Sequence, residues 1–434
     1  MINESAKNST NQSNLAPLGN NLAAWLSLIE ALHPKSIEMG LARVKKVFDQ
    51  LNIQLKCPVI TIGGTNGKGS TCAMLERIYS EAGYRVACYS SPHFIQFNER
   101  IRINLKNADD ATIVAAFNTV ESARQDTQLT YFEFSTLAAF WIFSQQNIDV
   151  AILEIGLGGR LDAVNIIEPN CAIVTSVDLD HMDYLGATRE KIGFEKAGIY
   201  RAGKLAICGD ESAPKSLTDF ATEIGADFQL INRDFKVEKT GQGWQFSANK
   251  INLQLPALAL HGDFQLNNAA CAVCAVQHLT QRLPVPQANI GAALSAVTLM
   301  GRFYQTQSNP AIIMDVAHNP QAAKSLAHNL QSTPCAGRTL AVFAMLADKD
   351  IVGVMRELTP HISAWYLADI HNVRGAKAID LQAKLGKLSQ TAQLFANVAA
   401  ALQAACKDAT KNDRIVVFGS FYTVAEAIES LNFS

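Results

Sequence analysis

The stretch PVITIGGTNGKGS, residues 58–70, decides the fold of this chain. It opens with a short β-branched run, passes through a glycine-rich turn and enters a helical pattern from about Ser70 to Ala82. Glycines let the backbone wrap a phosphate with its N–H groups pointing inward, and the start of a helix adds positive potential. We expect Lys68 to reach the outer phosphates. A strand, a glycine turn, a lysine, a hydroxyl residue and a helix in this order predict nucleotide binding.

The spacing of this loop departs from the standard phosphate-binding pattern G-x-x-x-x-G-K-[ST]. Ile62 occupies the place of the first glycine, and Gly69 separates Lys68 from Ser70. A glycine-rich segment by itself is usually only a turn. The strand before it and the helix after it favour the phosphate-binding interpretation.

Further apolar runs alternate with helical stretches along the chain. The runs cover 85–90, 149–155 and 171–177, and then 311–316, 339–345, 364–368 and 414–419. Helical periods cover 21–32, 136–146 and 290–297. Strands that read as continuous apolar runs are typical of parallel sheets buried on both faces. We expect an α/β fold with a flexible tail (1–20), a large phosphate-loop domain with a mostly parallel sheet (21–300) and a smaller Rossmann-like α/β domain (301–434).

Composition excludes several classes of protein. The 434 residues carry 37 Lys and Arg against 39 Asp and Glu, a net charge of −2, so we expect no nucleic-acid partner. Hydrophobic residues make up 48% and charged ones 18%, which indicates large buried cores. The longest apolar run, 269–276, is far too short for a bilayer, and residues 1–14 do not resemble a signal peptide. Nine scattered cysteines fit a reducing cytoplasm.

Acidic residues lie at the ends of two apolar runs. Glu154 lies within one of them, and a buried carboxylate is costly unless it is paired or binds a metal. Arg160 is the alternative partner. The sequence Asp178-Leu179-Asp180-His181 ends the next run. Beside a phosphate loop these groups suggest a magnesium site, although His181 is more often structural and Ser91 of the SSPH segment is more often part of a turn.

The second series of strands begins with Asp315-Val316-Ala317-His318-Asn319-Pro320. This places an acid, a base and an amide at the carboxyl edge of a sheet, where open α/β folds bind ligands. The alternative is that His318 or Asn319 caps a helix over 321–330. Arg302 is either a phosphate clamp or a linker charge. Cys271 and Cys274 lie in an apolar helical stretch and are expected in the core.

Nine motifs together resemble a known family. They are GTNGKGS (64–70), SSPH (90–93), LTYFEF (129–134), LEIGLGGRLDAVN (153–165), TSVDLDHMDYLG (175–186), EKAGIY (195–200), GRFY (301–304), DVAHNP (315–320) and GSF (419–421). In this order the chain, from about residue 36 to 421, resembles the dihydrofolate synthase/folylpolyglutamate synthase family of the Mur ligase superfamily. The resemblance implies a P-loop-containing Mur-ligase-like domain followed by the smaller α/β domain.

The resemblance also implies an activity. The chain would use ATP to add L-glutamate to dihydropteroate and to the γ-carboxyl of reduced folates, through an acyl phosphate. Mg²⁺, with two sites, is the implied cofactor, and a requirement for a monovalent cation such as K⁺ stays open. The implied partners are small molecules only, and the implied protein is a cytoplasmic monomer. One phosphate loop and one DVAHNP segment predict that both reactions share one site.

Site residues follow from the same resemblance. The implied ATP-binding residues are Thr65, Asn66, Gly67, Lys68, Gly69, Ser70, Asn268, Arg302 and Asp315. The implied pterin-binding residues are Ser36, Ile37, Glu38, Met39, Thr130, Tyr131, Phe132, Glu133, Leu161, Asp162 and Ala163. The implied metal ligands are Ser91, Glu154, His181 and a carbamylated Lys196, and the glutamate side holds His318 and Ser420. Catalytic roles fall to Lys68, Lys196, Asp315 and His318. For Lys196 the alternative is a solvated helix residue paired with Glu195.

Two rival functions remain at this point. A Mur ligase that acts on UDP-linked muropeptides carries a further N-terminal domain, whereas here the phosphate loop already begins near Gly63. A regulatory NTPase switch would leave the 315–320 motif and the second domain without a role.

Overall fold

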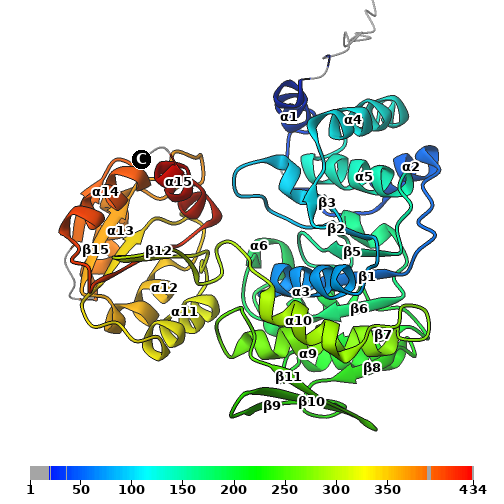
Figure 1. The fold of residues 1–434 in the computed structure, drawn as a ribbon. Helices are drawn as coiled ribbons and strands as arrows, with labels where there is room; N and C mark the ends of the chain where they lie inside the picture. Colours follow the sequence, from blue (N-terminus) through cyan, green and yellow to red (C-terminus); the bar gives the residue numbers. More distant parts are fainter. Residues whose placement is uncertain (1–18, 20, 36, 389–391, 433–434) are drawn as a thin grey trace, which may run out of the picture.

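The computed structural model describes residues 19, 21–35, 37–388 and 392–432. The predicted tail, apart from Gly19, and the predicted pterin residue Ser36 lie outside the described residues. Figure 1 shows two α/β units side by side, joined near residue 300. We call the part up to that junction the first unit and the part after it the second unit. The exact division at 21–300 and 301–434 stays a prediction.

The first unit is built on an eight-stranded sheet with the order β4-β3-β2-β5-β1-β6-β7-β8. Its strands are β1 (Val59–Gly63), β2 (Val86–Tyr89), β3 (Ile101–Ile103), β4 (Lys106–Asn107), β5 (Val150–Glu154), β6 (Cys171–Val174), β7 (Leu205–Cys208) and β8 (Asp227–Leu230). The six strands β2, β5, β1, β6, β7 and β8, in their order across the sheet, pair in parallel. The edge strands β3 and β4 pair antiparallel. The predicted mostly parallel sheet is therefore confirmed, with β2, β5 and β6 slightly shorter than expected.

Helices cover both faces of this sheet, which explains why its central strands are apolar throughout. One core contains residues of α1 (Leu22–Ala31), α2 (Ala42–Leu51), α4 (Asp110–Arg124), α5 (Tyr131–Ser144), η2 (Ala163–Ile166), α7 (Arg189–Ala197) and α8 (Lys215–Glu223). The other contains residues of α3 (Lys68–Glu81), α9 (Phe264–His278) and α10 (Gln287–Ala296). Cys271 and Cys274 of α9 are buried in this second core, as predicted. The helix predicted over 136–146 begins earlier, because Thr130 and Glu133 form a capping box.

A three-stranded antiparallel sheet was missed by the sequence analysis. It consists of β9 (Phe235–Thr240), β10 (Gly243–Ala248) and β11 (Ile251–Pro256), and it lies at the bottom of Figure 1. Trp244 and Phe246 alternate with polar residues in β10 and are buried with α9 in one core. This alternation of apolar and polar residues, with a period of two, could have predicted the strand.

The second unit has a six-stranded sheet with the order β12-β13-β17-β14-β15-β16. Its strands are β12 (Tyr304–Ser308), β13 (Ala311–Asp315), β14 (Thr339–Phe343), β15 (Ala364–Ala368), β16 (Ala392–Phe395) and β17 (Arg414–Phe418), and only β12 is antiparallel. One core holds residues of α11 (Pro320–Ser332), α12 (Ile351–Leu358) and α13 (Ala378–Gly386). The other holds residues of α14 (Val398–Asp408) and α15 (Phe421–Asn432). The four strands predicted here are confirmed.

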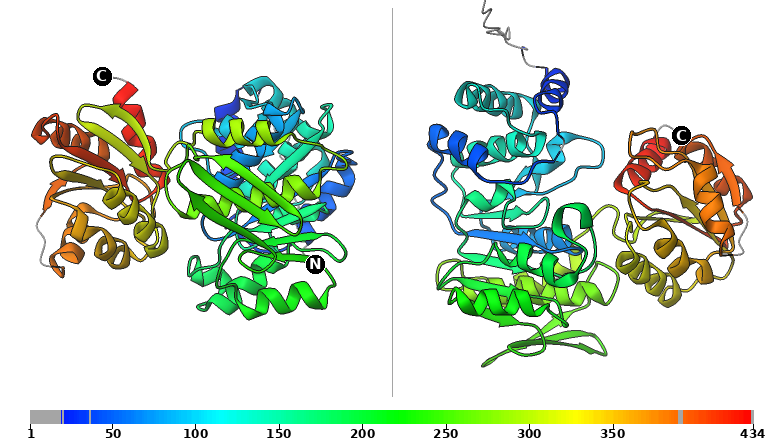
Figure 2. Two further views of the ribbon diagram at one scale, coloured as in Figure 1. Left: turned by 60° about the horizontal axis from the view of Figure 1, so that its bottom comes forward. Right: turned by 180° about the vertical axis from the view of Figure 1, so that it is seen from behind.

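The two sheets meet at their carboxyl edges. Loops that follow β1 and β6 contact loops that follow β13 and β14 across the junction. Figure 2 shows the second unit beside the first from two further directions. Ligands of open parallel sheets bind at carboxyl edges, so this junction is the place to look for a site. Among the described residues, we find no helix with the length and apolarity that a membrane crossing requires.

Candidate active site at the junction of two sheets

The phosphate loop follows β1 at the centre of the sheet, between β5 and β6. Gly64 has φ +145°, and a Cβ there would lie 1.9 Å from Thr175 Oγ1. Gly67 has φ +91°, and a Cβ there would lie 2.4 Å from Asn268 Oδ1. Glycine is therefore required at both positions by backbone conformation and by space. The loop is also held from β6, since Thr65 Oγ1 accepts from Asp178 N at 3.0 Å.

Lys68 is the first residue of α3, and its side chain bends over the loop. Its Nζ donates to Gly64 O at 3.1 Å and to Thr65 O at 3.3 Å. No carboxylate among the described residues forms an ion pair with it. An ammonium held over a glycine-rich loop at the start of a helix is suited to phosphate oxygens.

Ser70 and Asn268, both predicted ATP residues, are joined by a residue that sequence analysis missed. Ser70 is fully buried, and its hydroxyl accepts from Gln265 Nε2 at 3.2 Å. Asn268 Nδ2 donates to Gln265 Oε1 at 2.9 Å. Gln265 therefore fixes α9 against the start of α3.

Glu154 ends β5 beside the loop and is only 4% exposed. Its Oε2 accepts from Ser91 N at 3.2 Å. Burial raises its pKa, and the Lys68 charge opposes that rise. The alternative pairing with Arg160 is wrong, because Arg160 Nη2 lies 2.7 Å from Glu195 Oε1. A Cβ on Gly69 would lie 3.9 Å from both Glu154 Oε2 and Arg302 Nη2, so both side chains reach the loop.

Lys196 is buried, with 3% of its surface exposed. Burial, followed by the nearby Lys68 charge, lowers its pKa to about 7. Its side-chain Nζ forms no hydrogen bond or ion pair with any described residue. The predicted alternative, a solvated lysine paired with Glu195, is wrong, because Glu195 is bound to Arg160.

The predicted metal residues were compared with the needs of a divalent cation. The part of the chain that the structure describes has no group of three or more His, Cys, Asp or Glu that could hold a metal. Glu154 is nevertheless a buried carboxylate without a salt-bridge partner among the described residues, and it lies beside the phosphate loop. Burial lowers the pKa of His181 to about 4, so its imidazole is neutral and able to ligate. Glu154 fits a cation that takes its other ligands from phosphate and water. No contact between Glu154 and His181 is present among the described residues, since His181 lies beside Asp180 and Lys349.

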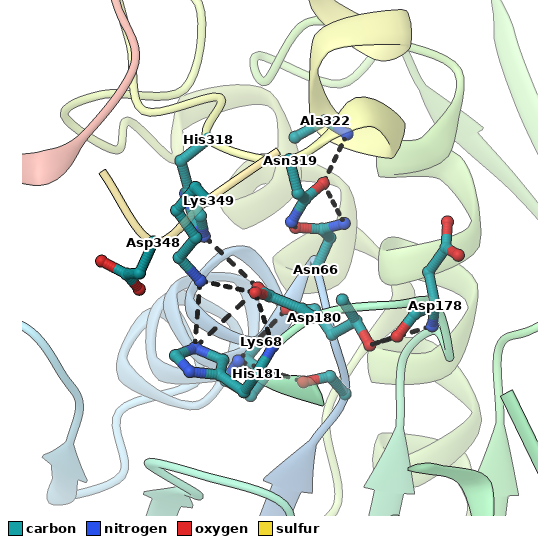
Figure 3. Close-up of polar contacts among 12 residues, drawn as sticks. Asn66, Lys68, Asp178, Asp180, His181, His318, Asn319, Ala322, Asp348 and Lys349 are labelled. Atoms are coloured by element: carbon teal, nitrogen blue, oxygen red, sulfur yellow. Dashed lines mark hydrogen bonds and ion pairs between the residues drawn. The ribbon is translucent and has the colours of Figure 1, made fainter. Parts of the chain in front are cut away.

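A charged cluster connects the two units, as Figure 3 shows. Asp180, after β6, accepts from Lys349 Nζ at 2.5 Å, and its Oδ2 lies 3.6 Å from His318 Nε2. His181 Nε2 lies 3.4 Å from Lys349 Nζ. Burial acts to raise the pKa of Asp180, but His318, His181 and Lys349 together hold it well below its usual range. Sequence analysis included Asp180 in the acidic group that suggested a magnesium site, but it did not predict the ion pair with Lys349, which no motif marks.

Three carboxamides form a second connection between the units, and Figure 3 shows two of them, Asn66 and Asn319. Asn66 Nδ2 donates to Gln321 Oε1 at 2.5 Å and to Asn319 Oδ1 at 3.3 Å. Asn319 Nδ2 donates back to Asn66 Oδ1 at 3.1 Å. Asn319 Oδ1 also accepts from Ala322 N at 2.9 Å, so the helix-cap alternative is correct for Asn319. His318 is no cap: its Nδ1 lies 2.8 Å from Val316 O.

Asp315 and Ser420 lie at the ends of adjacent strands of the second sheet. Asp315 Oδ2 accepts from Phe303 N at 2.9 Å, and Oδ1 accepts from Ala317 N at 2.9 Å. Burial raises the pKa of Asp315, and Arg302 opposes the rise. The Ser420 hydroxyl contacts Thr423 Oγ1 at 2.7 Å at the start of α15.

The predicted pterin segments lie together, and Arg43 connects two of them. Its Nη1 donates to Glu38 Oε1 at 3.1 Å, and its Nη2 donates to Glu133 Oε1 at 3.0 Å. Sequence analysis missed Arg43, because no local pattern marks it. A third segment is close, since a Cβ on Gly156 would lie 2.4 Å from the Phe132 ring.

The same segment contains Asp162, followed by Ala163. Asp162 Oδ2 accepts from Leu157 N at 2.8 Å. Burial raises its pKa to about 7. A Cβ on nearby Gly158 would lie 3.6 Å from Met39 Cε, which brings the first predicted segment to the same place.

A phosphate loop on one sheet edge, opposed by the acid and imidazole edge of a second α/β unit, defines an ATP-dependent ligase of the Mur type. Two family models agree: the Mur ligase middle domain matches residues 62–276, and the Mur ligase glutamate ligase domain matches 301–421. The chain is 43% identical over 415 residues to the dihydrofolate synthase/folylpolyglutamate synthase of Escherichia coli (strain K12), covering 95% of this chain and 96% of that one. The chain belongs to the dihydrofolate synthase/folylpolyglutamate synthase family.

Solved structures agree with this assignment. E. coli FolC in complex with DHPP and ADP superposes with a TM-score of 0.91 at 43% identity, covering 95% of this chain and 98% of that one. A bifunctional folylpolyglutamate synthase/dihydrofolate synthase with Mn, AMPPNP and L-glutamate bound gives 0.88 at 42% identity, with the same coverage of 95% and 98%.

Proposed function

We propose that this protein uses ATP to join L-glutamate to dihydropteroate, giving dihydrofolate, and to the γ-carboxyl of reduced folates, giving folylpolyglutamates. One observation carries the proposal: at the edge of the first sheet, Asn66 of the Lys68 loop contacts Asn319 of the second unit, and Asp180 after β6 lies 3.6 Å from His318 of the second unit. A nucleotide bound on one edge is thereby opposed by groups suited to an amino acid on the other. Related solved structures in complex with DHPP and ADP, or with Mn, AMPPNP and L-glutamate, support the same reaction.

The reaction begins with activation of a carboxylate, which is a poor acylating agent. One carboxylate oxygen attacks the γ-phosphorus of ATP, the bond to the β–γ bridging oxygen breaks, and ADP leaves. Lys68 stabilises the charge that develops on the phosphate oxygens. The product is an acyl phosphate.

The second step forms the amide. The α-amine of L-glutamate attacks the acyl carbon, a proton leaves the nitrogen, and inorganic phosphate departs with the C–O bonding pair. His318 is positioned by Val316 O and Asp180 to receive that proton. Two units that close on each other keep water away from the acyl phosphate.

The remaining roles follow the predicted sets. Thr65, Asn66, Gly67, Gly69, Ser70, Asn268, Arg302 and Asp315 hold ATP together with Lys68. The described pterin residues are Ile37, Glu38, Met39, Thr130, Tyr131, Phe132, Glu133, Leu161, Asp162 and Ala163. Ser420 serves the glutamate side together with His318.

Ser91, Glu154, His181 and a carbamylated Lys196 would hold Mg²⁺ at two sites. When bound, Mg²⁺ neutralises charge on the ATP phosphates. We leave a K⁺ requirement to direct assay. We further propose that the protein is a monomer in the cytoplasm. All nine cysteines are free, which supports a reducing compartment.

Product analysis by mass spectrometry tests the function. Purified protein receives ATP, Mg²⁺ and L-glutamate with either dihydropteroate or a reduced folate, and each product should gain one glutamyl residue. Phosphate release should require both the carboxylate substrate and glutamate. Release from ATP alone, without any glutamyl product, would favour the regulatory NTPase instead.

A further inference from the structure

Arg302 lies where the chain passes from the first unit to the second, and few contacts hold its side chain. A Cβ on Gly69 of the phosphate loop would lie 3.9 Å from Arg302 Nη2, so the guanidinium reaches that loop. Its Nη1 donates to Gly301 O at 3.1 Å. In the part of the chain that the structure describes, it forms no ion pair with a carboxylate. A long side chain held so weakly loses much freedom when a ligand fixes it.

The ring of Phe421 supplies the other contact of this guanidinium. Arg302 Cζ lies over the ring, 5.6 Å from its centroid. The face of an aromatic ring carries partial negative charge and attracts a cation at this distance. Phe421 is half-buried, so the contact is partly withdrawn from water, which strengthens the attraction.

Rigid backbone determines where Phe421 lies. Gly419, just after β17, has φ +120°, and a Cβ there would lie 2.2 Å from Ala344 O. The chain can therefore turn here only with glycine. α15 begins at Phe421, and its first turn is held because the Ser420 hydroxyl accepts from Thr423 N at 3.0 Å. The ring is thus carried by a helix start at the carboxyl edge of the second sheet.

The same ring also meets the first unit. The centroid of Phe94, which follows β2, lies 4.9 Å from that of Phe421, with 36° between the ring planes. Phe94 packs against the core that contains residues of α14 and α15. A Cβ on Gly301 would lie 2.7 Å from Phe94 Cζ, so Phe94 also lies against the residue before Arg302. Groups of both units therefore determine the place of the Phe421 ring.

We infer that Phe421 is a positioning residue for the nucleotide, because its ring holds the Arg302 guanidinium in the place where it meets the phosphates of ATP. The inference rests on the proposed role of Arg302 in ATP binding. Phosphate oxygens bind the N–H edge of a guanidinium and the ring contacts its face, so both contacts can exist together. A guanidinium already fixed over a ring loses less freedom when phosphate binds.

The alternative is that Phe421 only fills apolar space, and two substitutions separate the two roles. Phe421→Leu keeps an apolar side chain without the ring, and Phe421→Tyr keeps the ring. Calorimetric titration with AMPPNP and Mg²⁺ should give a Kd about fivefold or more above wild type for Phe421→Leu and within about twofold for Phe421→Tyr. Equal Kd values for the two variants, or an unchanged Kd for Phe421→Leu, would overturn the inference.

Phe228→Leu is the matched control. Phe228 is also half-buried, and its ring lies 5.3 Å from Arg233 Cζ, in β8 and the turn after it. This substitution removes a ring under an arginine that does not reach the phosphate loop, so the Kd for AMPPNP should stay at the wild-type value. A rise equal to that of Phe421→Leu would mean that loss of any such ring weakens binding, and it would overturn the inference.

A double-mutant cycle tests whether Phe421 acts through Arg302. Arg302→Gln alone should weaken AMPPNP binding, and Phe421→Leu added to it should weaken binding no further. Additive losses would overturn the inference. Normal binding by Arg302→Gln would refute the proposed role of Arg302 and the inference with it. Wild-type protein that binds AMPPNP but forms no glutamyl product would refute the proposed function and leave the binding comparison valid.

Kinetics separate positioning from a general loosening of the fold. Phe421→Leu should raise the KM for ATP about as much as the Kd, with the KM for L-glutamate within about twofold of wild type. Equal rises in both KM values would overturn the inference. If Phe421→Leu melts at a much lower temperature, pentafluorophenylalanine incorporated at position 421 replaces it. This residue nearly keeps the shape of the ring and reverses the charge of its face, so it should weaken AMPPNP binding, and unchanged binding would again overturn the inference.

Discussion

Lys349 and Asp180 come from different sheets and form an ion pair at 2.5 Å across the junction. Their side chains are only 9% and 10% exposed, respectively. Removing one member of a buried pair leaves an uncompensated charge, which typically costs several times more than losing an exposed pair. The contact therefore ties the position of the β14 loop to the end of β6.

Lys349→Met is expected to lower kcat/KM for glutamate addition by about tenfold or more, because Asp180 then lacks its closest counter-charge. The exchanged pair Asp180→Lys with Lys349→Asp should recover part of the loss. Steady-state kinetics of Asp180→Lys, of Lys349→Asp and of the variant that carries both substitutions form a double-mutant cycle. Strictly additive losses would show that the two residues act separately.

Lys68→Ala should lower phosphate release by at least about a hundredfold while leaving the melting temperature nearly unchanged, because the ammonium meets charge that grows in the transition state. Phosphate release and circular dichroism measure the two effects. Lys46→Ala, on the exposed face of α2, is the matched control. A folded Lys68→Ala protein with most of its turnover would remove Lys68 from the mechanism.

Gln321→Ala and Asn319→Ala should differ. Both lose a hydrogen bond to Asn66, so both should raise the KM for ATP by a few fold. Only Asn319 also caps α11, so Asn319→Ala should lower the free energy of unfolding by about 1 kcal/mol and Gln321→Ala by much less. Urea unfolding and ATP kinetics separate the effects, and equal destabilisation would contradict the capping argument.

Lys196→Ala should lose activity, and a short carboxylic acid added to the variant should restore some of it. The physical reason is a buried amine with a pKa of about 7: below that pH it is an ammonium, and above it the neutral amine reacts with CO₂. Labelled bicarbonate should therefore give a stronger carbamate carbon signal at pH 8 than at pH 6, and none in the variant. A fully active preparation whose Lys196 carries no carbamate would defeat the idea.

Dihydropteroate should inhibit glutamate addition to a folate competitively, because one phosphate loop and one DVAHNP segment serve both reactions. Initial rates at several concentrations of both substrates measure this. Saturating dihydropteroate without inhibition would show two separate sites.

Local sequence pattern predicted the parts of the site that belong to a single segment. The glycines between a strand and a helix indicate the phosphate loop. The position of a carboxylate inside an apolar run indicates Glu154. No such pattern marks Lys349, Arg43 or Gln265. Each bonds a distant residue of the site, namely Asp180, Glu133 and Ser70, at separations of 169, 90 and 195 residues, respectively. Pairing at such separations is decided by tertiary packing, which leaves no periodic trace. The sheet from β9 to β11 is different, since its alternation was present in the sequence and was overlooked.

Asn319 both caps α11 and bonds Asn66, and this combination has a consequence for how heat affects the protein. The oxygen that caps α11 also fixes which way the Asn319 amide faces Asn66. Fraying of the first turn of α11 would free that amide to rotate and would release the loop after β1, while the hydrophobic cores of both units stay intact. On warming, the enzyme should therefore lose activity several degrees below the melting temperature of the whole protein. Bound ATP should hold the loop in place and so reduce the difference between these two temperatures.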